Sequence, residues 1–245
     1  MLVMLPTYNE RGNVRKMVDQ IFALGLPTDI LFIDDNSPDG TGIILDEMAD
    51  DRKHKTVPQI FVIHRSGKKG IGSAHKEGIL WAYSWGYTTL ITMDSDFLHS
   101  PSDIPELVKC SETAEVVVTS RFVLKDSLNE WQVYRKIITK TGHFLTGLLL
   151  GMPYDATGAF RLYKLDKIPI RLFQMVESRG YPFFFESLAI LNLNGVKITE
   201  VPVRLKIRTY GDSKLTVKDL WQSVTFMAKL AWKVHMHTEK ITLEE

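Results

Sequence analysis

Two aspartates, Asp94 and Asp96, stand one residue apart directly after the apolar run Leu90-Ile91-Thr92-Met93. Like charges held this close repel each other and raise each other's pKa. A divalent cation removes the repulsion, and Mg²⁺ and Mn²⁺ prefer oxygen ligands that they can share with substrate phosphates. Asp-x-Asp pairs are common on surface loops and mean little by themselves. The position of this pair directly after an apolar run is what favours metal binding. We therefore expect Asp94 and Asp96 to be ligands of Mg²⁺ or Mn²⁺.

Apolar runs nearer the N-terminus also end in polar residues. The first continues into Pro6-Thr7-Tyr8-Asn9-Glu10, where Tyr8 offers a flat stacking surface. A strand-to-helix turn explains this segment equally well. The second continues into Asp34-Asp35-Asn36-Ser37-Pro38-Asp39-Gly40. Turn formation explains its later residues, but not two adjacent carboxylates, which could accept hydrogen bonds from a nucleotide base or ribose.

Basic residues supply candidate partners for phosphate groups. The glycine-rich basic loop at 64–74 opens a helix, and backbone N–H groups at a helix start favour anions. This loop lacks P-loop spacing, and a solvated basic loop is the alternative interpretation. Arginine matches phosphate geometry with its forked guanidinium. We expect each of five basic residues to be a surface charge when taken alone. Together they could bind phosphate groups: Arg121, Arg135, Arg161, Arg208 and Lys214.

Five apolar runs in the first 120 residues predict the strands that would position these side chains: 2–5, 30–33, 60–63, 89–93 and 116–119. They are continuous rather than alternating, as in strands buried on both faces. Helix-like stretches separate them, which predicts a parallel sheet with right-handed crossovers. In such sheets ligands bind at the carboxyl ends of the strands. For the first helix we expect Asn9 as N-cap and Gly25 as its end.

The pattern changes after Phe122. It predicts a long helix over 129–150, strands near 160–163 and 196–203, and a helix near 186–193. The segment at about 217–237 is typical of an amphipathic helix, which can lie in a membrane interface or pack on the core. The sequence leaves both open. We predict one α/β domain over 1–215, followed by a C-terminal amphipathic helix within 216–245.

Composition sets wide limits on function. The chain has 245 residues, of which 44% are hydrophobic, so one domain with a sizeable core is expected. A net charge of +1 argues against a nucleic-acid partner. Cys110 is the single cysteine and excludes an internal disulfide. We find neither a signal peptide nor an apolar run of about 18 residues, and expect a peripheral protein on the cytosolic face of a membrane.

The motifs resemble those of a known family. Pro-Thr-Tyr-Asn-Glu, Ile-Asp-Asp-Asn-Ser-Pro-Asp-Gly-Thr, Met-Asp-Ser-Asp-Phe and Arg-x-x-Gly-x-Ser-Lys occur in the same order in dolichyl-phosphate mannose synthases. These are family 2 glycosyltransferases with a GT-A fold, which is Rossmann-like with a mostly parallel sheet. The resemblance covers about Met1 to Leu215, and its most specific parts are 33–41 and 208–214.

The resemblance implies transfer of mannose from GDP-mannose to a polyprenyl (dolichyl) phosphate, at a membrane surface and with a possible membrane-embedded partner subunit. It implies Mg²⁺ or Mn²⁺ on Asp94 and Asp96, which are catalytic together with Arg121. It places the acceptor phosphate against Arg121, Arg135 and Ser213. It assigns donor binding to Pro6, Tyr8, Glu10, Ile33, Asp35, Ser95, Arg208 and Lys214. Glu186 matches an acidic family position, to which we assign no role.

One departure from the family concerns the metal. Leu98 stands before His99, where some relatives have a side chain that can ligate metal. A lipid phosphate is largely dianionic at neutral pH and needs no strong base, which agrees with the lack of an obvious catalytic histidine among these motifs. A single direct displacement by this phosphate would invert the anomeric centre of the sugar, which we expect. Three alternatives remain: transfer of glucose from UDP-glucose to a polyprenyl phosphate, transfer of a sugar to a surface glycan, and a non-catalytic nucleotide-sugar or lipid-binding protein.

Overall fold

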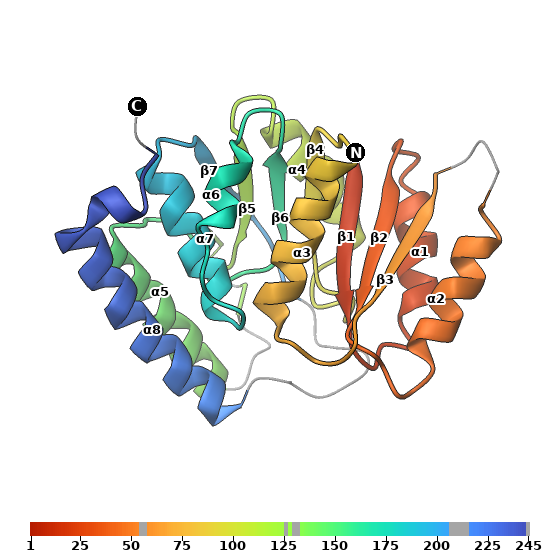
Figure 1. Cartoon of the computed structure of the whole chain (residues 1–245), viewed down its shortest axis with the longest axis horizontal. Coiled ribbons are helices and arrows are strands. Elements are labelled where there is room, and N and C mark those ends of the chain that lie inside the picture. Colours follow the sequence, from red (N-terminus) through yellow and green to blue (C-terminus); the bar gives the residue numbers. More distant parts are fainter. Residues whose placement is uncertain (54–57, 125–126, 129–132, 206–215, 244–245) are drawn as a thin grey trace.

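A computed structural model describes the chain except for residues 54–57, 125–126, 129–132, 206–215 and 244–245. Its centre is a seven-stranded sheet with the strand order β3-β2-β1-β4-β6-β5-β7 (Figure 1). The sheet confirms all seven predicted strands. Their bounds are β1 Leu2–Thr7, β2 Asp29–Asp34, β3 Ile60–His64, β4 Thr89–Thr92, β5 Val116–Ser120, β6 Arg161–Lys164 and β7 Ile198–Pro202.

Helices cover both faces of the sheet because successive strand residues point to opposite sides. In β1, Leu2 and Met4 join one core cluster, together with side chains of α3, α6, α7 and α8. Val3 and Leu5 join the other, together with α1, α2 and α4. The helices are α1 Val14–Phe22, α2 Thr41–Asp50, α3 Ile71–Ser84, α4 Ile104–Cys110, α5 Val133–Leu150, α6 Ile170–Gln174, α7 Pro182–Leu193 and α8 Val217–Met236, with short 3-10 turns at Pro101–Asp103 and Thr238–Lys240.

One strand runs against the others. β6 pairs antiparallel with β4 and with β5, whereas the remaining pairs are parallel. The prediction of a mostly parallel sheet is therefore confirmed. Because β6 is inverted, it begins at the same edge of the sheet where β4 ends, and Arg161 lies in register with Thr92.

The expected N-cap of the first helix was wrong. Helix α1 begins at Val14, and Asn13 occupies the capping position. Asn9 adopts a left-handed backbone with φ of 58°, and its N–H donates to the Ser37 hydroxyl at 3.0 Å. The chain therefore makes an extra turn before the helix starts. Gly25, with φ of 67°, lies just beyond the end of α1, as expected.

Helix α8 packs on the core with one face, and whether its other face meets a membrane stays a prediction. Met227 and Leu230 are buried in the core cluster, and α8 packs beside α5 and α7. Its other face carries Trp221, Val224 and Trp232, which are 70%, 52% and 57% exposed. No described helix is both long and apolar enough to cross a bilayer. The boundary between 215 and 216 adjoins residues outside the described part, so the proposed division there stays a prediction.

Candidate functional site

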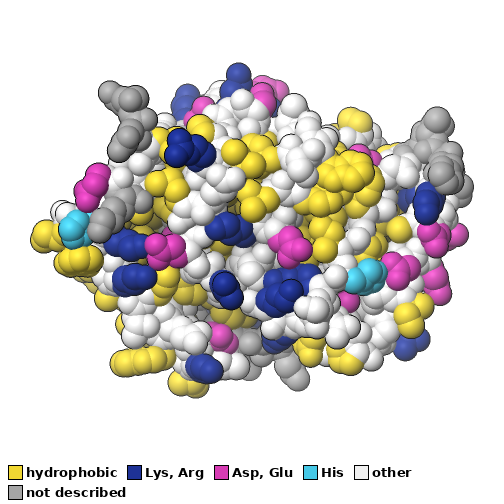
Figure 2. All heavy atoms as spheres, in the orientation of Figure 1, with side chains coloured by type: hydrophobic (Ala, Val, Ile, Leu, Met, Phe, Trp, Pro, Cys, Tyr) yellow, Lys and Arg dark blue, Asp and Glu magenta, His cyan; other side chains and the backbone are white. Residues whose placement is uncertain are grey.

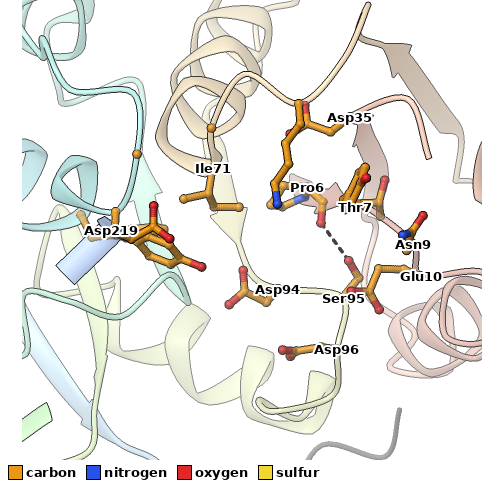
Figure 3. Close-up of a pocket in the computed structure, with 16 residues that line it drawn as sticks. Pro6, Thr7, Asn9, Glu10, Asp35, Ile71, Asp94, Ser95, Asp96 and Asp219 are labelled. Carbon is orange, nitrogen blue, oxygen red and sulfur yellow. Dashed lines mark hydrogen bonds between the residues drawn. The ribbon is translucent and has the colours of Figure 1, made fainter. Parts of the chain in front are cut away.

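A pocket lies at the carboxyl ends of β1, β2 and β4, where the sheet was expected to bind ligands (Figure 3). Seven of the predicted site residues line it together, although they come from three separate strand ends. They are Pro6, Tyr8, Glu10, Asp35, Asp94, Ser95 and Asp96. Parallel strands bring their ends to one edge, so residues almost 90 positions apart in sequence meet here.

A tight turn after β4 presents the two aspartates to the pocket. The Asp96 carboxylate accepts a hydrogen bond from the Leu98 N–H at 3.0 Å. The Ser95 hydroxyl donates to the Pro6 carbonyl at 2.9 Å, which ties β4 to β1 (Figure 3). Phe97 has φ of 60°, an uncommon conformation for a bulky residue. Its ring packs into the core under the ammonium of Lys16, 5.3 Å from the ring centroid, so packing supports the strained turn.

The acidic turn suits a cation that is shared with a substrate. Within the described residues, no three His, Cys, Asp or Glu side chains gather as a complete metal cluster. Mg²⁺, however, is commonly held by one or two carboxylates, with water and substrate phosphates as its other ligands. Asp94 and Asp96 fit that arrangement. Leu98 adds no ligand and instead packs against the small cluster of Leu128, Val203 and Leu205.

The two aspartates that end β2 have different roles. Asp34 is a turn residue: its carboxylate accepts from the Ser37 N–H at 3.0 Å and from the hydroxyls of Ser37 and Thr7. Asp35 lines the pocket and forms an ion pair with buried Arg65 at 2.5 Å. Burial raises the pKa of Asp35, and the Arg65 charge opposes that rise. Arg65 was missed because a single arginine in a basic loop gives no sequence signal for a buried ion pair.

Several predicted residues lie away from this pocket. Ile33 is fully buried in the core against Gly78 of α3. Arg121 follows β5, and its guanidinium binds the carboxylate of Asp155 and the hydroxyl of Thr157. Arg135 lies on α5. Three further predicted residues are outside the described part of the chain: Arg208, Ser213 and Lys214.

The pocket also has walls that sequence reasoning did not assign. Lys68, from the glycine-rich loop, lies 4.9 Å above the ring centroid of Tyr8. The opposite wall comes from α7 and α8, which are far away in sequence and carry no local signal for this site. The additional lining residues are Thr7, Asn9, Lys68, Gly70, Ile71, Gly180, Tyr181, Phe184 and Asp219.

Two glycines let the loop at 179–180 approach the start of α3. A Cβ added at Gly70 would lie 2.4 Å from the Arg179 carbonyl oxygen. One added at Gly72 would lie 2.4 Å from the Cβ of Phe183 and 2.5 Å from the Gly180 carbonyl oxygen. The Ser73 N–H donates to Arg179 O at 2.9 Å. The glycines therefore permit a backbone contact that joins two walls of the pocket.

Gly72→Ala is expected to lower the free energy of unfolding by about 1–3 kcal/mol, because the methyl group would overpack this contact. Gly142→Ala is the matched control. Gly142 lies inside α5 with its nearest heavy atom, Thr157 Cγ2, at 3.9 Å, so alanine should stabilise the helix by up to about 1 kcal/mol. Urea unfolding of both variants measures the difference. A Gly72→Ala protein as stable as the parent would contradict the close approach.

Comparison with known proteins decides the family. The glycosyl transferase family 2 model matches residues 2–169, which include the three strand ends of the pocket. The chain belongs to glycosyl transferase family 2. It is 33% identical over 236 residues to the polyprenol monophosphomannose synthase of Mycolicibacterium smegmatis, covering 93% of this chain and 85% of that protein. It is also 33% identical over 216 residues to the undecaprenyl-phosphate mannosyltransferase of Micrococcus luteus, covering 88% and 87% of the two chains.

Solved structures show that this family 2 chain has the expected GT-A type of fold. The mannosyltransferase PcManGT from Pyrobaculum calidifontis, solved with GDP-Man and Mn²⁺, aligns with a TM-score of 0.55 at 15% identity, covering 98% of this chain and 68% of that one. S. aureus TarS 1–349 aligns with a TM-score of 0.54 at 14% identity, with the same coverage. At such low identity the likeness concerns the fold alone.

Proposed function

We propose that this protein transfers mannose from GDP-mannose to a polyprenyl (dolichyl) phosphate, with Mg²⁺ or Mn²⁺ and with inversion at the anomeric carbon. The observation that carries the proposal is the pocket in which Asp94 and Asp96 lie with Tyr8 and Asp35. It joins a cation-binding pair to residues suited to a nucleotide. Two relatives at 33% identity are named for mannosyl transfer involving polyprenol or undecaprenyl phosphate.

The donor would bind at the ends of β1 and β2. Tyr8 offers a ring for stacking, and the carboxylate of Asp35 can accept hydrogen bonds from the N–H groups of a guanine base. Arg65 holds Asp35 in place through the ion pair at 2.5 Å. Asp94 and Asp96 would hold the cation against the donor diphosphate, with Ser95 beside them. When bound, the ion neutralises negative charge that grows on the leaving diphosphate.

The reaction needs no base from the protein. The acceptor phosphate oxygen attacks the anomeric carbon, the bond from that carbon to the diphosphate breaks, and GDP leaves. Two histidines near the centre of the fold are poor bases, because burial and arginine charges lower the pKa of His75 to about 3 and of His99 to about 4. Arg121 and Arg135 are the described cations that we assign to the acceptor phosphate, with Arg208, Ser213 and Lys214 as further phosphate contacts outside the described part.

The acceptor is a lipid, and we assign its membrane to the face formed by α5 and α8. Figure 2 shows hydrophobic side chains reaching the surface along α8. Helix α8 also supplies Asp219 to the pocket wall, so the proposed membrane face begins beside the site. The exposed apolar residues of this face are Val133, Tyr134, Ile137, Phe144, Leu148, Val217, Trp221, Val224, Trp232 and Met236. We propose peripheral binding on the cytosolic side, and a membrane-embedded partner stays a prediction.

Replacing both Trp221 and Trp232 with glutamate should weaken binding to anionic phospholipid vesicles at least about tenfold, because two interfacial aromatic anchors are replaced by charges. Sedimentation with vesicles measures the partition. Trp85→Glu is the matched control, since Trp85 is 60% exposed but lies at the end of α3, near the β3 edge. Equal binding by the double variant and by the parent would show that another face meets the membrane.

The proposed reaction is tested by supplying labelled GDP-mannose and a polyprenyl phosphate in detergent, with Mg²⁺ or Mn²⁺ and with a chelator in parallel. Lipid-soluble label from GDP-mannose that disappears with the chelator is the expected result. Transfer from UDP-glucose instead would establish the alternative donor. A retained α configuration in the product would exclude direct displacement. Absence of transfer from either donor, with nucleotide binding intact, would favour a glycan acceptor first and a non-catalytic protein second.

A further inference from the structure

Arg161, the first residue of β6, is a fully buried cation whose hydrogen-bond partners in the described part of the chain are all neutral. It is 1% exposed, so the expectation of a surface charge was wrong: β6 lies inside the sheet rather than at its edge. Its guanidinium donates to the Ala156 carbonyl at 2.8 Å, the Ser187 hydroxyl at 3.3 Å and the Tyr163 hydroxyl at 3.5 Å. Its Nε finds no hydrogen-bond partner among the residues that the structure describes. No carboxylate of the described residues lies within ion-pair distance of it.

Among the described residues, the neighbouring titratable groups form no ion pair with Arg161. Glu186 is buried on α7, but its carboxylate accepts from the N–H groups of Glu177 and Ser178 and from the Ser178 hydroxyl. His75 stays neutral, since burial and the Arg161 charge lower its pKa to about 3. A buried charge without a counter-ion is costly. A site that binds anions can recover that cost when its ligand arrives.

The position of Arg161 connects it to the pocket. It lies in register with Thr92, two residues before Asp94. Its guanidinium carbon is 5.7 Å from the ring centroid of Phe184, and Phe184 lines the pocket. Among the described residues that line the pocket, five carry a carboxylate and one an ammonium group: Glu10, Asp35, Asp94, Asp96, Asp219 and Lys68.

We propose that Arg161 is a positioning residue whose buried charge acts across Phe184 to favour the diphosphate of the donor and the charge that develops on it as the sugar leaves. Electrostatic fields reach further in a protein interior than in water. A fixed charge behind the wall therefore needs no direct contact with the ligand. This inference rests on the proposed nucleotide-sugar function, and it gives Arg161 a role that its neutral contacts do not explain.

The test compares guanosine with GDP. Both should bind where we place the base, at the ends of β1 and β2, and only GDP carries phosphate charge. Arg161→Met should weaken GDP binding about tenfold at constant Mg²⁺, because the variant loses the positive charge that attracts the diphosphate. Guanosine binding should change by less than about twofold. Arg161→Lys, which keeps the charge, should retain most of the GDP affinity. Equal losses for GDP and guanosine, or no loss for either, would overturn the proposal.

A second variant keeps the test decisive if Arg161→Met does not fold. Ser187→Asp would place a carboxylate where the Ser187 hydroxyl now meets Arg161, and the new ion pair should also weaken GDP binding selectively. Ser187→Asn is its uncharged control and should leave the GDP to guanosine ratio unchanged. An unchanged ratio in Ser187→Asp would contradict the inference. Titrating the parent with UDP and uridine as well separates the proposed GDP-mannose specificity from the proposed role of Arg161. The parent protein reports which base is preferred, and the Arg161 and Ser187 variants report the effect of the buried charge.

Discussion

Asp96→Asn is expected to reduce sugar transfer by roughly 1000-fold, the largest effect on activity that we predict. The change removes one of two carboxylates at the end of β4 but keeps the size of the side chain. Several kcal/mol of charge stabilisation by a bound cation correspond to a rate change of about this size. The Leu98 N–H can still donate to the asparagine oxygen, so the turn at Asp96 should keep its shape. Initial rates at saturating Mn²⁺ measure the loss.

The matched control is Asp51→Asn, which neutralises an exposed carboxylate at the end of α2. Its transfer rate should equal that of the parent. Unfolding curves should also coincide for the three proteins, which would show that the Asp96 effect is chemical. If Asp96→Asn kept a tenth or more of the parent rate, the assignment of the cation to Asp94 and Asp96 would be wrong.

Asp155→Ala is expected to lower the free energy of unfolding by about 3–5 kcal/mol, because it leaves the guanidinium of Arg121 buried without a counter-ion. The Asp155 side chain is fully buried and accepts from the backbone N–H, Nε and Nη2 of Arg121. Burial disfavours its charge, but Arg121 outweighs burial and lowers the pKa of Asp155. Denaturant unfolding at neutral pH measures the cost.

The double variant Arg121→Met with Asp155→Ala is the control for this prediction. It removes both charges, so it should be more stable than Asp155→Ala alone, since only the single variant has an unpaired buried cation. A loss below about 1 kcal/mol for Asp155→Ala would mean that solvent reaches Arg121 and replaces the lost partner. Arg121 would then be better placed for direct phosphate contact than the ion pair suggests.

The half of the site that comes from strand ends could be predicted from the sequence. Continuous apolar runs fix the strands, and parallel strands must end at one edge of the sheet. The proximity of Tyr8, Asp35 and Asp96 can therefore be predicted without knowing any tertiary contact. The fold class was predictable for the same reason, because short strands alternating with helical stretches leave few arrangements.

What could not be predicted depends on tertiary contacts. Phe184 and Asp219 reach the pocket from α7 and α8, and the local sequence pattern does not predict where a helix will pack. Arg161 follows a short apolar stretch that does not reveal which strand lies inside the sheet. Arg65 in a basic loop looks like a solvated charge until its carboxylate partner is placed beside it. The misplaced N-cap has a similar origin, since the backbone at Asn9 is set by a contact with Ser37.

The inverted strand β6 has a consequence for how the protein is made. In the described part of the chain, the strands that pair with β5 are β6 and β7, and both follow it in the sequence. While the ribosome adds residues 121–160, the segment Val116-Val117-Val118-Thr119-Ser120 has no strand to pair with, and β4 has one open edge. A valine-rich strand without a partner readily joins other exposed strands. We therefore expect the nascent chain to be prone to aggregate after β5 emerges, until Arg161–Lys164 pairs with both β4 and β5.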